Sequence, residues 1–118
     1  MLLISVLGPV ELRADGRLLV VPAGKTTEVL VRLALDAMVT VSADRLIEDV
    51  WGVEPTAVGR NAMQSKISKL RRALGGAAVV WSGRLGYRLE VDPSAVDALE
   101  VLRIADAAKG LLDAGNAT

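Results

Sequence analysis

The sequence predicts an α+β fold with an N-terminal antiparallel sheet, a three-helix core, a C-terminal β-hairpin and one further helix. Three observations predict it. Short alternating apolar segments open the chain, apolar residues then recur at helical spacing in three successive segments, and two further strand-like segments flank a tight turn at 82–85. The chain has 118 residues, of which 52% are hydrophobic and only 3% aromatic, so it can build one domain around an aliphatic core.

Three short antiparallel strands are predicted at the start of the chain, at 2–7, 10–14 and 17–21. Asp15-Gly16 is a pair typical of a two-residue hairpin turn, and Pro22 ends the third strand because it cannot donate a ladder hydrogen bond. The apolar N-terminus lacks a basic leader, so we interpret it as a strand and not as a signal peptide. No apolar run reaches the roughly 18 residues of a membrane-spanning helix, and no membrane association is expected.

A first amphipathic helix is predicted over 25–37, with Thr26 or Thr27 as its N-cap. Its apolar residues form one stripe, which consists of Val29, Leu30, Leu33, Ala34 and Ala37. The stretch "GKTT" at 24–27 resembles the end of a phosphate-binding loop. Position 19 is Leu where that motif needs Gly, so we assign these residues to the start of the helix and expect no nucleotide site.

A second amphipathic helix is predicted between Ser42, a favourable N-cap, and Gly52. Its apolar side consists of Leu46, Ile47, Val50 and Trp51. An aromatic side chain can also stack on a nucleic-acid base. We interpret Trp51 as a core residue because it lies on the apolar side of its helix.

The third helix, predicted over 57–74, also separates apolar from polar residues. At about 100° per residue, its four large apolar residues fall in a narrow sector that must face the core; they are Met63, Ile67, Leu70 and Leu74. The rest of its surface offers amides, hydroxyls and cations without a carboxylate, from Arg60, Asn61, Gln64, Ser65, Lys66, Ser68, Lys69, Arg71 and Arg72. Gly75-Gly76 ends the helix.

The charge of the chain is zero overall but unevenly distributed. Residues 1–54 carry −3, residues 55–89 carry +7 without a single acidic residue, and residues 90–118 carry −4. A solvated surface normally mixes both signs, so the basic block favours a nucleic-acid contact over an ordinary charged surface. A carboxylate on the third helix would repel a phosphate backbone, which accounts for its absence there.

A β-hairpin is predicted from 77–81 and 86–91, with Arg84 at its tip and Arg88 in its second strand. Helix, loop, helix and hairpin in this order are typical of a winged helix-turn-helix, whose last helix lies in the major groove. Arg84 would then reach the neighbouring minor groove or its phosphates. Taken alone, Arg84 is equally compatible with an ordinary exposed turn. Tyr87 is expected to pack under the third helix.

Four stretches of the chain are similar to one protein family. They are "LGPVEL" with "DGR", "ADRLIEDVWG", "RNAMQSKISKLRRALG" and "GYRLEVDPSAVDALEV", and they span about residues 6–103. In them the chain resembles the DNA-binding domain of Streptomyces antibiotic regulatory proteins, a branch of the OmpR/PhoB-type winged helix regulators. The resemblance implies a four-stranded N-terminal sheet, a recognition helix at 57–74 and a wing at 78–91. Lys66 stands where many relatives carry an uncharged residue, so a different sequence preference is expected.

The resemblance also implies roles for individual segments. The DNA-facing residues would be Asn61, Gln64, Ser65, Lys66, Ser68, Lys69, Arg71 and Arg72 on the helix and Arg84 in the wing. The loop 52–58 would lie where related proteins contact RNA polymerase, and direct-repeat DNA sites are implied. The winged helix domain would cover 1–93, and 94–118 would be the first helix of a truncated bacterial transcriptional activation domain, so a fragment of a longer regulator is expected.

The last helix is predicted over 95–114 with Ser94 as its N-cap. Its apolar residues, at positions 99, 101, 102, 104, 108, 111 and 112, cover a wider arc than one packing surface needs. One side is expected to pack on the winged domain. We expect weak self-association through the other.

The sequence therefore predicts sequence-specific binding of double-stranded DNA for transcription regulation in the bacterial cytoplasm. The alternative is a protein-interaction module whose winged helix no longer binds DNA, which the basic block disfavours. No enzyme is expected, because the chain has no Cys and no His and its acidic residues form no convergent cluster. The same composition predicts no metal site and no cofactor.

Overall fold

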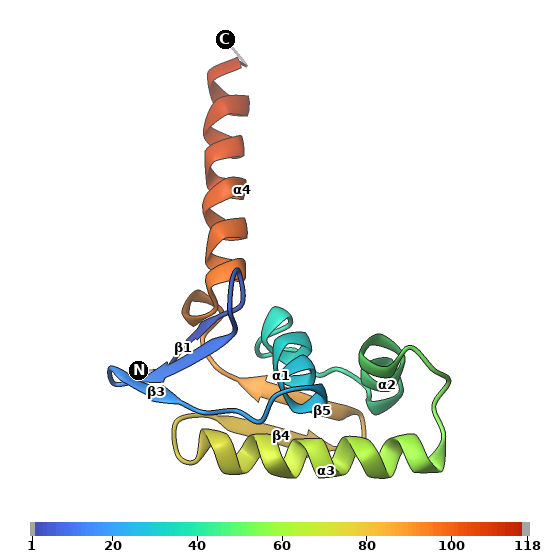
Figure 1. Cartoon of the computed structure of the whole chain (residues 1–118). Coiled ribbons are helices and arrows are strands. Elements are labelled where there is room, and N and C mark those ends of the chain that lie inside the picture. The colour runs from blue at the N-terminus through green and yellow to red at the C-terminus, as the bar shows by residue number, and fades with distance from the viewer. Residues whose placement is uncertain (1, 117–118) are drawn as a thin grey trace.

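A computed structural model describes residues 2–116 and confirms the predicted order of elements. Along the chain these are β1 (Leu2–Ser5), β2 (Glu11–Ala14), β3 (Arg17–Leu19), α1 (Lys25–Leu35), α2 (Ala43–Trp51), α3 (Ala57–Leu74), β4 (Val79–Gly83), β5 (Gly86–Glu90), the short 3-10 helix η1 (Pro93–Ala95) and α4 (Asp97–Asn116). Helix α3 runs along one edge of the molecule beside the β4–β5 hairpin, and α4 projects away from the rest (Figure 1). This is the winged helix arrangement that the sequence predicts.

The N-terminal sheet is antiparallel with the order β1-β2-β3, and its register pairs Ile4 with Leu12 and Leu12 with Leu19. Ile4 and Leu12 are buried against the helices, as strand alternation requires. The strands are shorter than predicted, and the expectation of a fourth strand is wrong for the part of the chain that the structure describes. Pro22 lies between β3 and α1, and the chain turns directly into the helix there.

The core is built where helices α1, α2 and α3 meet, and it is aliphatic as predicted. Each predicted apolar stripe is buried: Val29, Leu30, Leu33, Ala34 and Ala37 of the first helical segment, Leu46, Ile47 and Val50 of α2, and Met63, Ile67, Leu70 and Leu74 of α3. Trp51 is partly buried and packs against this core, which confirms its interpretation as a core residue. The four buried residues of α3 fix the rotation of that helix about its own axis.

The predicted ends of α2 are confirmed, whereas the predicted start of α1 is not. The Ser42 hydroxyl accepts a hydrogen bond from the Arg45 N–H at 3.1 Å, and Gly52 ends α2 with φ of 67°, both as predicted. The expected threonine cap of α1 is wrong, because Gly24 occupies the N-cap position with φ of 86°. Thr26 is buried, and the Thr27 hydroxyl instead donates to the Pro22 carbonyl at 2.9 Å.

The hairpin is held on two sides. Val80 and Leu89 are paired across the strands and are buried in the core. On the other edge of β5, Val41 exchanges both backbone hydrogen bonds with Tyr87, at 2.8 and 2.9 Å, so the segment before α2 adds a single bridge to the hairpin. A Cβ on Gly86 would lie 2.1 Å from the Val41 carbonyl oxygen, and Gly86 has φ of 136°. Only glycine permits this close approach.

Helix α4 begins later than predicted, and Ser94 is not its cap. Ser94 lies in η1, where its N–H and hydroxyl both donate to Asp92, and α4 starts at Asp97. The Asp97 carboxylate accepts the N–H groups of Val6 and Leu7 at 2.8 and 3.2 Å and so joins the helix to the loop after β1. Leu99 packs on the core, but all side chains from 101 to 112 are exposed, so the expected packing of one whole side of the helix is limited to its first turn.

No helix among the described residues is both long and apolar enough to cross a membrane.

Replacing Gly86 with Ala should lower the free energy of unfolding by about 2 kcal/mol or more, because the new Cβ meets the Val41 carbonyl and the backbone conformation disfavours L-residues. Urea denaturation measures the change. Gly76→Ala is the matched control, since its Cβ would enter open space without a positive φ, and we expect its effect to stay within about 0.5 kcal/mol. Equal stabilities of the two variants would contradict this view of the hairpin.

Candidate nucleic-acid interface

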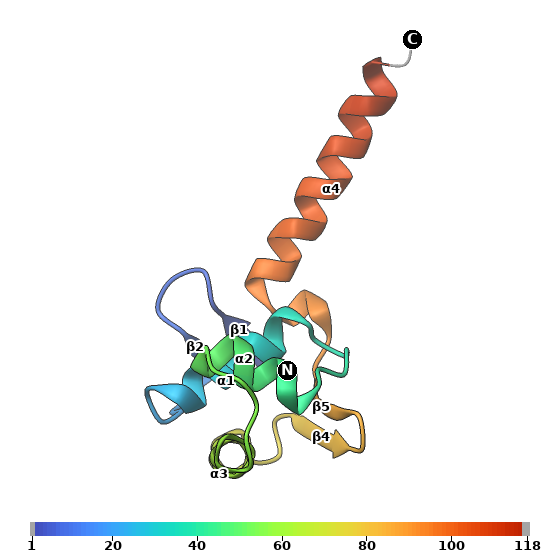
Figure 2. The ribbon, with the colours of Figure 1, turned by 90° about the vertical axis from the view of Figure 1, so that its right-hand side faces the viewer.

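The exposed face of α3 consists mainly of polar side chains and contains no acidic residue. Burial of Met63, Ile67, Leu70 and Leu74 turns the opposite side of the helix to solvent. Viewed along its axis, α3 lies at the outside of the molecule, next to the hairpin (Figure 2). Six polar side chains are exposed on it and have no hydrogen-bond or ion-pair partner within the described part of the chain: Asn61, Gln64, Ser65, Ser68, Lys69 and Arg72. Lys66 is half-buried on the flank.

The start of α3 is set by its own sequence. The Thr56 hydroxyl accepts a hydrogen bond from the Gly59 N–H at 3.0 Å and so caps the helix. Pro55 precedes the cap and restricts Glu54 to extended backbone, which separates α3 from α2. A threonine directly before the predicted helix start was a usable signal for this cap. The N-terminal turns of α3, from Arg60 to Ser65, are therefore held on a rigid element.

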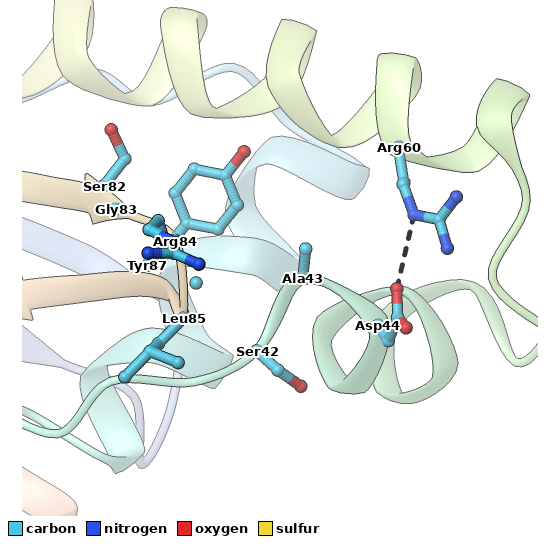
Figure 3. Close-up of a pocket in the computed structure, with 10 residues that line it drawn as sticks. Ser42, Ala43, Asp44, Arg60, Ser82, Gly83, Arg84, Leu85 and Tyr87 are labelled. Carbon is cyan, nitrogen blue, oxygen red and sulfur yellow. Dashed lines mark hydrogen bonds and ion pairs between the residues drawn. The ribbon is translucent and has the colours of Figure 1, made fainter.

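Arg60 is the one predicted residue of α3 that pairs with an acid among the described residues. Its Nε lies 3.4 Å from Asp44 Oδ1 of α2 (Figure 3). Both side chains are about half exposed, so the pair contributes little to stability. The residues lie 16 positions apart, and no sequence pattern linked them.

A cleft of about 520 Å³ separates the hairpin tip from α2 and the first half of α3. Arg60 lines it from α3, Arg84 from the hairpin turn, and Asp44 from α2 (Figure 3). Arg84 is exposed and has no partner among the described residues. Tyr87 is half-buried, packs against the core and points toward α3, in agreement with its predicted place. The two cations thus flank one opening between helix and wing.

Two of the predicted arginines bond to other residues of the domain. The Arg71 guanidinium donates to the Val80 carbonyl and to the Ser82 hydroxyl of β4. The Arg88 guanidinium donates to Glu90 Oε1 at 2.9 Å and to the Thr40 hydroxyl at 3.3 Å, and it lies 4.6 Å from the centre of the Trp81 ring. The donors of Arg71 that face β4 are therefore occupied within the domain, and Arg88 is held by contacts with Thr40, Glu90 and Trp81.

Two acidic residues of the helices, Asp36 and Asp49, are paired with arginines. Arg32 of α1 lies 2.6 Å from Asp36 and 2.7 Å from Asp49 of α2, which Arg45 also contacts at 3.1 Å. The hydrogen bond from Arg32 holds the pKa of the Asp49 carboxyl below its usual value. Asp49 therefore stays ionised near neutral pH, and the pairing links α1 to α2. Among the described residues no group of three or more acidic side chains could hold a metal ion.

Comparison with known families decides the identity of the domain. The family model described as "Transcriptional regulatory protein, C terminal" matches residues 20–89, which is more than half of the chain and includes all of α1, α2, α3 and the hairpin up to Leu89. The chain belongs to this family. It is an OmpR/PhoB-type winged helix domain, and the family consists of transcriptional regulators rather than enzymes. The predicted family is thereby confirmed.

Its relatives include regulators of the predicted Streptomyces branch. RedD of Streptomyces coelicolor is 32% identical over 118 residues, which cover 94% of this chain and 34% of RedD. DnrI of Streptomyces peucetius is 30% identical over 122 residues, which cover 95% of this chain and 45% of DnrI. The chain thus spans less than half the length of these relatives.

Solved structures agree on the fold. EmbR of Mycobacterium tuberculosis, solved in complex with a low-affinity phosphopeptide, superposes with a TM-score of 0.73 and 29% identity over 83% of this chain and 27% of that one. The DNA-binding domain of Escherichia coli CadC superposes with a TM-score of 0.50 and 22% identity over 70% of this chain and 79% of that one. The second likeness concerns the fold alone.

Proposed function

We propose that this OmpR/PhoB-type domain binds specific sites on double-stranded DNA in transcription regulation, with α3 in the major groove. One observation carries the proposal. Six exposed amide, hydroxyl and cationic side chains lie on one face of α3 without an internal partner, in a segment from Pro55 to Leu89 that contains no acid. Such a face offers donors and acceptors to base edges and cations to phosphates.

The position of each side chain along α3 suggests its role. The proposed base contacts are Asn61, Gln64 and Ser65 in the first half of the helix and Lys66 just past its middle. Ser68, Lys69 and Arg72 lie in the second half and are the proposed phosphate contacts. Arg84, at the exposed tip of the hairpin, is proposed to contact the adjacent minor groove or its backbone. Arg60, across the cleft from Arg84, can join them by exchanging Asp44 for a phosphate.

The loop between α2 and α3 is proposed as a contact for RNA polymerase. Val53 of this loop and Val58 of the first turn of α3 are 55% and 79% exposed, on either side of the Thr56 cap. Apolar side chains so close to a DNA-contacting helix would be accessible to a protein bound to neighbouring DNA. The proposed setting for all these contacts is the bacterial cytoplasm.

Self-association is proposed through α4. Its exposed apolar residues are Val101, Leu102, Ile104, Leu111 and Leu112. A helix with so much exposed apolar surface gains stability when a second apolar surface covers it. Two copies on a direct repeat would bind more tightly than one copy on a single site, because the second binds at a raised effective concentration.

Lys69→Ala and Arg72→Ala should each weaken binding to every duplex and lower the slope of log K against log salt concentration by about 1, because each variant loses one phosphate contact. Mobility-shift titrations at several salt concentrations measure the slope. Arg17→Ala removes an exposed cation of β3 and serves as the control, with an unchanged slope. If neither α3 variant changes the slope, the placement of α3 on DNA is wrong.

Leu102→Glu should reduce self-association of the chain at high concentration, since a carboxylate in an apolar contact must be desolvated. Analytical ultracentrifugation over a range of concentrations measures this. Leu18→Glu is the matched control, because Leu18 of β3 is 54% exposed and Leu102 is 60% exposed. A wild-type chain that stays monomeric throughout would contradict the proposal for α4.

A further inference from the structure

Arg71 differs from its neighbours on α3 in the direction of its head group. Its Nε and Nη2 both donate to the Val80 carbonyl, at 3.0 and 2.8 Å, and Nη2 also donates to the Ser82 hydroxyl at 3.0 Å. Arg72, the next residue, is exposed and has no partner among the described residues. Of these two adjacent arginines, one is therefore bound to the hairpin and the other is open to solvent.

The contact of Arg71 joins the two elements that would bind DNA. Helix α3 ends at Leu74 and β4 begins at Val79, so the two are linked by four residues that include Gly75-Gly76. Across residues 2–116, every side-chain hydrogen bond between α3 and the β4–β5 hairpin comes from Arg71. Core packing of Val80 and Leu89 holds the base of the hairpin, whereas Ser82 lies near its tip, two residues before Arg84.

The hydrogen bonds of Arg71 are suited to holding the hairpin at a fixed position relative to α3. A guanidinium presents its donors in a rigid planar fork, so hydrogen bonds from Nε and Nη2 to one carbonyl fix both distance and angle. The partners are a carbonyl and a hydroxyl, and neither neutralises the positive charge. The charge of Arg71 therefore still adds to the basic field around α3, while the donors that face β4 are not available to a phosphate.

We infer that Arg71 is a positioning residue, which sets the wing at a fixed distance from α3 so that Arg84 and the α3 face reach DNA together. This inference rests on the proposed function. A wing that is already in place loses less conformational freedom on binding, so its contact adds more to affinity. Without the Arg71 bonds, the hairpin tip samples several positions relative to α3, and the contribution of Arg84 falls.

The decisive experiment is a double-mutant cycle on duplex DNA with Arg71→Met, which keeps the aliphatic stem but has no donors. In the wild-type background Arg84→Ala should weaken binding roughly tenfold. In the Arg71→Met background the same change should weaken it less than about twofold, because the wing is no longer held in place. In the Arg72→Met background Arg84→Ala should keep its full tenfold effect. Equal effects of Arg84→Ala in all three backgrounds would overturn the role of Arg71.

A measurement without DNA separates this role from the proposed function. Backbone ¹⁵N relaxation of the free protein should show increased mobility at residues 81–86 in Arg71→Met and unchanged mobility in Arg72→Met. Ser82→Ala, which removes only one of the three bonds, should show a smaller increase, and it provides the same test if Arg71→Met does not fold. Unchanged mobility in the Arg71 or Ser82 variant overturns the inference, whether or not the protein binds DNA. Failure of the wild-type chain to prefer any duplex would overturn the proposed function alone.

Discussion

The apolar seam of α3 is the constraint on which the rest of this domain depends. Met63, Ile67, Leu70 and Leu74 are at most 2% exposed and pack against α1 and α2. Truncating such a side chain to Ala typically costs about 2–5 kcal/mol, so the helix cannot rotate about its axis without losing a large part of the stability of a small domain. Its polar face is therefore presented to solvent as a consequence of core packing, and it needs no internal partner to stay there.

The wing is positioned by a second set of contacts, one of which comes from a side chain of α3 itself. Gly86 allows the segment before α2 to approach β5, and the Val41–Tyr87 bridge ties the hairpin to it. Arg71 then fixes the other side of the hairpin against α3. The hairpin also carries a cross-strand contact, in which the Arg88 guanidinium lies 4.6 Å from the centre of the Trp81 ring. A winged helix thus needs both a packed recognition helix and a restrained hairpin before its cations can act together.

The sequence predicted α3 well because two local signals agreed. Its apolar residues recur at helical spacing, and Gly75-Gly76 follows the last of them. The bounds 57–74 and all four buried residues are those of the structure. The cap Ser42 was predictable for the same reason, since a capping side chain acts within its own turn.

The remaining features depend on contacts between residues far apart in the chain. The role of Asp97 could not be predicted from the residues around it, because its carboxylate accepts N–H groups from residues about 90 positions away. Arg71 and Arg72 are indistinguishable by residue type, and only the position of β4 decides which of them is engaged. Arg88 was grouped with the basic block, but strand pairing places it opposite Trp81. Charge counts therefore located the basic surface, while the direction of each cation required the structure.

Base readout by α3 is tested most directly by selecting bound sequences from a randomised duplex pool with the wild-type chain and with Gln64→Ala and Lys66→Ala. If α3 reads base edges, the wild type enriches a defined site. Each variant then loses preference at one or two positions of that site, at a cost of about 1–3 kcal/mol on the wild-type sequence. Enrichment of the same sequences with the same affinities by all three proteins would contradict readout by this face of α3.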